Sequence, residues 1–249
     1  DPLQYEVDGE FKDITPETVS IQVTREDGSV ETREHTFYHW EYGLIVNLKS
    51  AAAGISPALA ELFDGWPTPS GTVYALRDAN VDNLRGIEMW TRVGQAENIP
   101  DLVDALKLIG NPLFHTLAAD RSGDTFYGEI SAIPNIDQAK LDDCVTGINQ
   151  VILQLTNEAI VALDGSRSEC QWGEDADAPE GSGLFGYQSL PKIIGAPYVA
   201  NSNDSYWLSN PNQPLEGFPS TMGFAGHEGK QQNLRTQINH AMVAARLAG

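Results

Sequence analysis

Residues 201–211 read NSNDSYWLSNP and follow a short apolar stretch at residues 198–200. One interpretation is a polar loop in which asparagine and serine side chains cap their own backbone. The other is functional, because an asparagine carboxamide held rigidly at a strand end can donate a hydrogen bond to a developing oxyanion. Taken alone, these residues favour the loop, and the functional interpretation needs support from the rest of the chain.

The rest of the chain predicts strand hairpins interleaved with helices. Polar and apolar residues alternate over residues 20–24 and 30–38 around the turn Glu26-Asp27-Gly28, which predicts a β-hairpin. Apolar residues at helical spacing predict helices, and Pro100 is a favoured first-turn residue. The further predicted elements are strands at 43–46, 73–76 and 198–200, a hairpin at 115–133, helices at 57–63, 83–95, 100–109, 145–162 and 231–247, and a loop at 164–197. This succession predicts the α+β class with mostly antiparallel sheets, and we expect residues 1–249 to form a single domain.

Charge and hydropathy exclude several classes of partner. The chain has 35 acidic and 15 basic residues and a net charge of −20, which argues against nucleic acid or an anionic membrane surface. No apolar run approaches the roughly 18–20 residues needed to span a bilayer. The first residues, DPLQY, contain no start methionine and no signal-peptide pattern, so we expect the chain to be an internal piece of a longer protein.

No complete catalytic, metal-binding or cofactor-binding motif of a common type is found in the sequence. Residues 181–186, GSGLFG, match the dinucleotide pattern GxGxxG, but an acidic loop precedes them and Pro191 follows, so the strand and helix of that site are not predicted. The five histidines show no HExxH spacing and the cysteines no CxxC spacing, so no metal site is predicted. No GxSxG nucleophile elbow is present.

The two cysteines, Cys144 and Cys170, are expected to form a disulfide. Two thiols alone leave open that both are buried and reduced. Their neighbours, DDC and SECQ, are polar and typical of turns, which favours a surface disulfide. Such a bond would imply a periplasmic or secreted protein.

Several stretches together resemble the penicillin amidase family, an N-terminal-nucleophile hydrolase family. They are residues 74–80 (YALRDAN), 116–123 (TLAADRSG), 163–168 (LDGSRS) with Cys170 and Trp172, 201–205 (NSNDS) with Trp207, and 210–211 (NP) with 214–218 (PLEGF). In this order they run from about Tyr5 to Arg235 and look closest to the branch of aculeacin A acylase and N-acyl-homoserine lactone acylases. The resemblance implies part of an αββα sandwich, made as a precursor that is exported and cuts itself into two chains.

The resemblance also implies a reaction. In the family, the new N-terminal serine of the large chain attacks an amide carbonyl with its own α-amine as base, and an acyl-enzyme forms. A backbone N–H and the second asparagine of an N-x-N motif hold the oxyanion. Asn203 matches that asparagine, so its expected role is catalytic, as an oxyanion-hole donor. In family terms the chain begins after the serine, so the isolated chain is expected to be inactive and to need the remaining segments of the same precursor as partners.

The stretch before the final helix departs from the family pattern. Relatives carry an arginine before the final helix, whereas residues 227–230 read HEGK, and Lys230 cannot reproduce the planar fork of arginine.

Candidate residues for binding an apolar acyl chain are Trp90, Leu113 and Phe114, for which core packing is the alternative role. On branch resemblance, a fatty-acyl amide such as an acyl-homoserine lactone is favoured over a lipopeptide or a β-lactam. No cofactor is predicted; calcium stays open because some relatives bind it.

A second hypothesis is that the chain keeps the acylase scaffold without catalysis, as a binding or structural module. The absence of the family arginine from residues 227–230 motivates it. A metal-dependent hydrolase is a more distant third.

Overall fold

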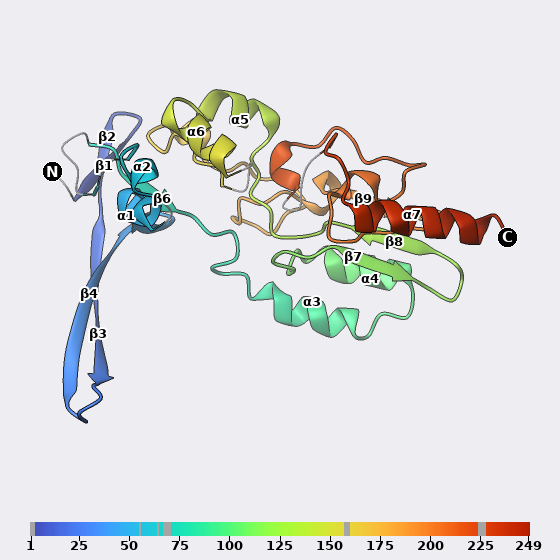
Figure 1. Ribbon diagram of the computed structural model, residues 1–249, viewed down its shortest axis with the longest axis horizontal. Coiled ribbons are helices and arrows are strands. Elements are labelled where there is room, and N and C mark those ends of the chain that lie inside the picture. The colour runs from blue at the N-terminus through green and yellow to red at the C-terminus, as the bar shows by residue number, and fades with distance from the viewer. Residues whose placement is uncertain (1–2, 55, 64, 67–70, 157–159, 224–227) are drawn as a thin grey trace. The chain divides into compact units, whose positions relative to one another are not determined.

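The computed structural model describes residues 3–249 except 55, 64, 67–70, 157–159 and 224–227. Seven α-helices and three antiparallel sheets within these residues confirm the predicted α+β class (Figure 1). Contacts divide the chain into two compact units, one of residues 1–78 and 165–169 and the other of residues 79–164 and 170–249. The expectation of one domain over residues 1–249 stays a prediction.

The first unit is built around a long hairpin. Strands β3 (Thr15–Thr24) and β4 (Val30–Trp40) pair in antiparallel register from Thr15 opposite His39 to Thr24 opposite Val30, which confirms the predicted hairpin. Residues directly opposite each other share a face, so Val19 and Ile21 lie on one face of the ribbon, and Thr18 lies on the other. Both faces are largely exposed in this chain.

Further strands extend the same sheet, whose order is β3-β4-β5-β6. The predicted strands at 43–46 and 73–76 correspond to β5 (Gly43–Val46) and β6 (Tyr74–Leu76). The rest of the unit consists of a two-stranded sheet, β1 (Gln4–Val7) with β2 (Glu10–Asp13), and the short helices α1 (Leu48–Ala53) and α2 (Pro57–Ala60).

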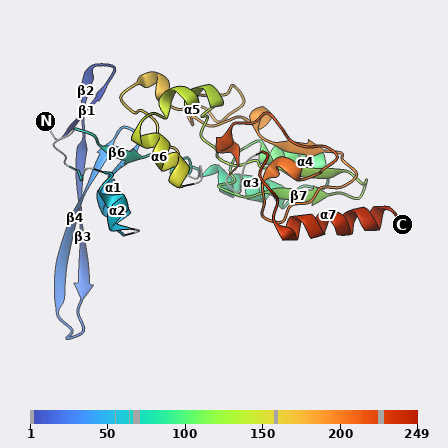
Figure 2. The same cartoon turned by 45° about the horizontal axis from the view of Figure 1, so that its top comes forward.

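The second unit contains a three-stranded sheet with β8 in the middle. The sheet consists of β7 (Thr116–Ala119), β8 (Thr125–Gly128) and β9 (Lys192–Ile194). Neighbouring residues of a strand point to opposite faces, and Phe126 and Tyr127 are both fully buried, so β8 is covered on both faces. In Figures 1 and 2 the strands β7 and β8 run between the helices α4 (Ile99–Leu106) and α7 (Leu234–Leu247). The main core joins residues of α4 and of α3 (Arg85–Val93) to those of β8 and β9.

Several expected elements are wrong in extent or kind. The helix predicted at 145–162 is described only as α6 (Ile148–Leu155), and α5 (Gln138–Cys144) was not predicted. The predicted loop at 164–197 contains β9 and two 3₁₀ helices (Ser168–Cys170 and Tyr187–Ser189). Residues 198–200 form no strand, because the Ala200 N–H pairs with the Ser209 carbonyl inside the next loop. Two more 3₁₀ helices follow (Tyr206–Leu208 and Ser220–Met222).

The apolar residues at helical spacing in α3 and at its N-cap do not enter the core, since Leu84, Ile87 and Trp90 are exposed and Met89 is the buried residue. The helix contacts the core through Met89 instead, where it joins α4 and the sheet. Along α7 the apolar residues Leu234, Ile238 and Met242 are likewise exposed.

Close backbone packing fixes the start of α3. A Cβ atom at Gly110 would lie 2.7 Å from the carbonyl carbon and oxygen of Arg85 and from the nitrogen of Gly86, all of them backbone atoms. We therefore expect Gly110→Ala to reduce the free energy of unfolding by about 1–3 kcal/mol, as overpacking does. Gly94→Ala is the matched control, because a Cβ there meets nothing closer than 3.5 Å and φ is −66°. Urea unfolding that leaves Gly110→Ala as stable as Gly94→Ala would contradict this packing.

Candidate active site

A tight turn of residues 201–205, the 201–205 turn, presents Asn203. The Asn201 side chain closes the turn on itself: its Oδ1 accepts from the Asp204 N–H at 3.2 Å, and its Nδ2 donates to the Asp204 carbonyl at 2.9 Å. Asn203 lies at the tip with φ of +56°, in the left-handed region that asparagine tolerates better than most residues. The two asparagines therefore differ: Asn201 holds the turn closed through its hydrogen bonds, and Asn203 lies at the apex.

Asn203 differs from the other asparagines of this stretch. Asn201 is bonded to the turn, and Asn210 donates to the Tyr198 carbonyl at 3.0 Å and accepts from the Asn212 N–H at 2.9 Å. The Asn203 side chain is exposed and makes no hydrogen bond to any other described residue. It is thus the carboxamide of this stretch whose donors remain available to a ligand, and its oxyanion role stays a prediction.

The turn is attached to the start of α7 through the buried side chain of Asp204, which is 5% exposed. Its Oδ2 accepts from the Asn233 N–H at 2.6 Å and from the Thr236 hydroxyl at 3.0 Å, and its Oδ1 accepts from the Ser205 N–H at 3.1 Å. Asn233 is the N-cap of α7, where a carboxylate is favoured by the unpaired N–H groups and the helix dipole.

A buried polar group lies just before β7 and at the end of β8, near enough to this turn for the charge of Asp204 to act on it. The His115 Nδ1 is 2.9 Å from the Tyr127 hydroxyl and 3.8 Å from Oε2 of Glu129. Burial lowers the pKa of His115, partly offset by the negative charge of Asp204. Burial also raises the pKa of Tyr127, reinforced by the charge of Glu129. The histidine is therefore neutral and the tyrosine protonated at neutral pH.

The lowered pKa of His115 predicts acid sensitivity. Below its ordinary pKa of about 6.5 the unfolded chain takes up a proton that the folded chain refuses, so the free energy of unfolding falls as the pH drops towards the folded pKa. One such group contributes at most about 1.4 kcal/mol per pH unit. Urea unfolding at pH 7.5 and 5.5 should show a smaller loss for His115→Gln than for the parent protein. Equal losses in the two proteins would contradict the assignment of this acid sensitivity to His115.

Within residues 228–230, the described part of the stretch where relatives carry an arginine, no cation is held by an ion pair to another described residue. Gly229 is exposed in a left-handed conformation, and Lys230 is partly buried without an ion pair to any described residue. Glu228 instead holds the loop, because its carboxylate accepts from the Tyr206 hydroxyl and the Gly217 and Phe218 N–H groups. His227 lies outside the described residues.

The three predicted substrate-binding residues are not core residues, since Trp90, Leu113 and Phe114 are 54%, 49% and 57% exposed. Trp90 lines an open, mostly apolar cavity of about 370 Å³ together with Ile87 and Pro112, and Leu113 and Phe114 directly follow Pro112 in the chain. Asn203 lines neither this cavity nor the second one, of about 470 Å³, beside α4 and β7.

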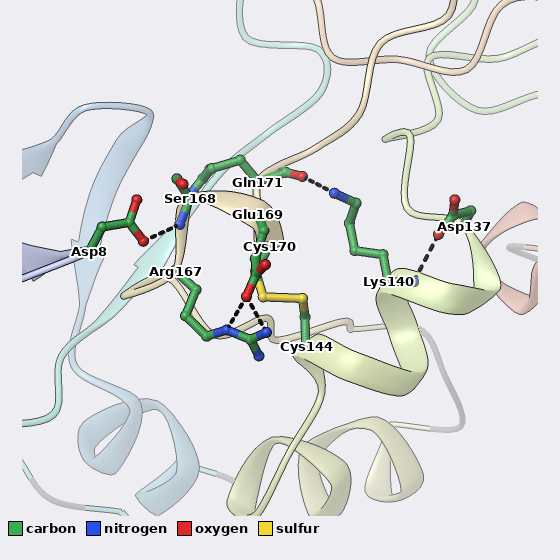
Figure 3. The surroundings of a disulfide bond; sticks show 9 residues. All are labelled: Asp8, Asp137, Lys140, Cys144, Arg167, Ser168, Glu169, Cys170 and Gln171. Atoms are coloured by element: carbon green, nitrogen blue, oxygen red, sulfur yellow. Dashed lines mark hydrogen bonds and ion pairs between the residues drawn. A yellow bond between two sulfur atoms is a disulfide. The ribbon is translucent and has the colours of Figure 1, made fainter.

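The structure contains the Cys144–Cys170 disulfide, with Cα atoms 5.6 Å apart (Figure 3). Both cysteines are 1% exposed, so the expected surface position is wrong. The bond lies at the end of α5, whose Lys140 donates to the Gln171 carbonyl at 2.6 Å, and Asp137 caps the same helix (Figure 3). The polar neighbours in sequence therefore point outward while the sulfur atoms are enclosed.

The described residues contain neither a metal-binding cluster nor a membrane-spanning helix. Across the described ranges, no three His, Cys, Asp or Glu side chains are grouped so that they could hold a metal ion. In the same part of the chain, none of the helices is both long and apolar enough to cross a bilayer.

Known proteins resemble this chain along almost its whole length. The family model for penicillin amidase matches residues 1–248. Aculeacin-A acylase of Actinoplanes utahensis is 35% identical over 254 aligned positions, covering 100% of this chain and 29% of that protein. The acyl-homoserine lactone acylase PvdQ of Pseudomonas fluorescens Pf0-1 is 32% identical over 246 positions, covering 96% of this chain and 28% of that protein.

A solved structure agrees with the fold. The thermostable penicillin G acylase from Alcaligenes faecalis superimposes with a TM-score of 0.58 at 15% identity, over 97% of this chain and 34% of that one. The chain therefore spans under a third of the length of the two curated relatives. The family model and these identities show that the chain belongs to the penicillin amidase family.

Proposed function

We propose that residues 1–249 supply the oxyanion-binding side of an acylase active site, with Asn203 as a donor. The attacking serine would lie in a segment of the protein outside these residues. The observation that carries the proposal is the contrast within the 201–211 stretch: Asn201 and Asn210 are bonded to the backbone, whereas Asn203 is exposed without such a bond.

A donor of this kind is useful because it is held before the reaction begins. The two hydrogen bonds of the Asn201 side chain and the burial of Asp204 fix the backbone on both sides of Asn203. Preorganised donors stabilise developing charge without reorganisation in the transition state, which is why they contribute strongly to rate.

In the proposed reaction, a serine hydroxyl attacks the carbonyl carbon of a linear amide while an amine takes its proton. The carbonyl oxygen becomes an oxyanion that accepts a hydrogen bond from Nδ2 of Asn203 and a second one from a backbone N–H. When the C–N bond breaks, the leaving amine takes a proton and an acyl-enzyme remains. Water then releases the acid.

The names of the relatives suggest the substrate class. One acts on acyl-homoserine lactones and the other on aculeacin A. We therefore propose an amide-linked acyl chain, in an acyl-homoserine lactone, a lipopeptide or a β-lactam, with Trp90, Leu113 and Phe114 offering exposed apolar surface to the acyl part.

The disulfide supports a proposal about location. Disulfides persist in oxidising compartments, so we propose a periplasmic or secreted protein whose other segments, from the same precursor, are its partners. The net charge of −20 gives no support for nucleic acid as a partner.

The test uses the whole precursor that contains residues 1–249. Purified, processed protein is incubated with an acyl-homoserine lactone, a lipopeptide and penicillin G, and the free acid and the free amine are measured together. Equal amounts of acid and amine from at least one substrate are expected. Lactone opening without amine release, or binding without turnover, would contradict the acylase function and favour the scaffold hypothesis.

A further inference from the structure

We propose that Asp204 is a positioning residue for Asn203, because it ties the turn that carries Asn203 to the first turn of α7. The inference rests on the proposed function, in which Asn203 binds the oxyanion. Asp204 itself touches no substrate, since its carboxylate is buried and its oxygens accept bonds from the protein.

Asp204 joins two parts of the chain that are distant in sequence. Its Oδ2 accepts from the Asn233 N–H at 2.6 Å and from the Thr236 hydroxyl at 3.0 Å, and these residues are 29 and 32 positions away. Its Oδ1 accepts from the Ser205 N–H at 3.1 Å inside the turn. One carboxylate thus connects the turn to a 14-residue helix.

A second side-chain contact also attaches the 201–205 turn to α7. Asn239, on the second turn of α7, donates from Nδ2 to the Ser202 hydroxyl at 3.3 Å. Residues on both sides of Asn203 therefore contact α7, with Ser202 before it and Asp204 after it. A shift of the turn relative to α7 would have to break both attachments, so the helix defines where the apex lies.

Asparagine has the shape of Asp204 but cannot accept the same set of hydrogen bonds. An ionised carboxylate accepts at both oxygens, whereas a carboxamide of the same shape has one acceptor and one NH₂ donor. In Asp204→Asn, the NH₂ group must face either the Ser205 N–H or the Asn233 and Thr236 donors. Either orientation leaves a buried donor unpaired, and the turn must move to relieve it.

The consequence for rate follows from geometry. A displacement of about 1 Å in a group that must meet the transition state can lower the rate about 10²-fold. We expect Asp204→Asn to lower kcat about 10²-fold with little change in KM, because Asn203 is aimed at the developing oxyanion rather than at the bound substrate. Thr236→Val, which removes one donor, should give a smaller loss, and Thr236→Ser should restore the parent value.

The experiment is a double-mutant cycle in the whole processed protein, with kcat expressed per folded enzyme. Asp204→Asn is made in the parent and in the Asn203→Gly background. If Asp204 acts through Asn203, it should lower kcat in the parent and have almost no further effect once the carboxamide is gone. Asp137→Ala is the control for general destabilisation, since it removes the N-cap of α5 within the same unit.

The outcomes separate the two proposals. If Asn203→Gly is inactive but Asp204→Asn and Thr236→Val keep the parent kcat, the positioning role is wrong and the proposed function stands. If Asp204→Asn lowers kcat equally in both backgrounds, or only as much as Asp137→Ala does, its effect is general destabilisation and the positioning role is again wrong. If Asn203→Gly retains full activity, the proposed function fails and the positioning role fails with it.

Discussion

Replacing Asn203 by glycine is expected to lower the amide hydrolysis rate of the processed enzyme by about 10²- to 10³-fold, the usual cost of one oxyanion donor. Glycine is the informative replacement because Asn203 has φ of +56°, which glycine adopts without strain. The change therefore removes the carboxamide and leaves the turn conformation accessible. Steady-state kinetics on the substrate that the parent enzyme cleaves best should show the loss in kcat.

Two further variants complete this prediction. Asn203→Ala should lower the hydrolysis rate by the same factor. It should also reduce the free energy of unfolding by about 1 kcal/mol, because the left-handed conformation is strained for alanine. Asn212→Ala, at an exposed asparagine of the same loop, should leave both quantities unchanged. Equal activity of the parent and Asn203→Gly would remove Asn203 from the catalytic site.

Loss of the Cys144–Cys170 disulfide is expected to reduce the free energy of unfolding by about 3 kcal/mol. The bond closes a loop with a sequence separation of 26, and in the chain-entropy account its loss frees that loop in the unfolded state. Replacing both cysteines by alanine is preferable to serine, because both positions are buried and would enclose unpaired hydroxyls. Urea unfolding of the parent and the double variant measures the difference.

Reductant supplies the control for this second prediction. It should lower the midpoint of the parent and leave that of the double variant unchanged. The intact mass of the parent should lie about two units below its fully reduced mass. Two free thiols in the native protein by titration would contradict the disulfide.

Strands and helices that are marked by a pattern of neighbouring residues could be predicted from the sequence. The hairpin of β3 and β4 is encoded in consecutive residues, since alternation and the turn at Gly28 set the strands and their register. Helix α4 was similarly marked by Pro100 and its apolar face. Helix α5 was missed because seven residues that bury only Leu141 and Cys144 leave too weak a period to detect.

The burial of particular side chains could not be predicted in the same way. Leu84, Ile87 and Trp90 have the spacing of a core-facing helix, yet the core of the second unit meets α3 at Met89. Period alone states that a helix has an apolar side and does not state what covers it. For the same reason Cys144 and Cys170, among polar neighbours in sequence, turned out to be enclosed.

The candidate site also combines features that local sequence indicates with features that long-range packing decides. Residues 201–211 and their companions along the chain were enough to indicate the family and to single out Asn203, because those signals are residue identities at short spacing. That Asp204 is buried against Asn233 and Thr236, by contrast, depends on α7 folding back across about thirty residues of chain. Such contacts arise from the packing of distant segments, and no local pattern of residues specifies them.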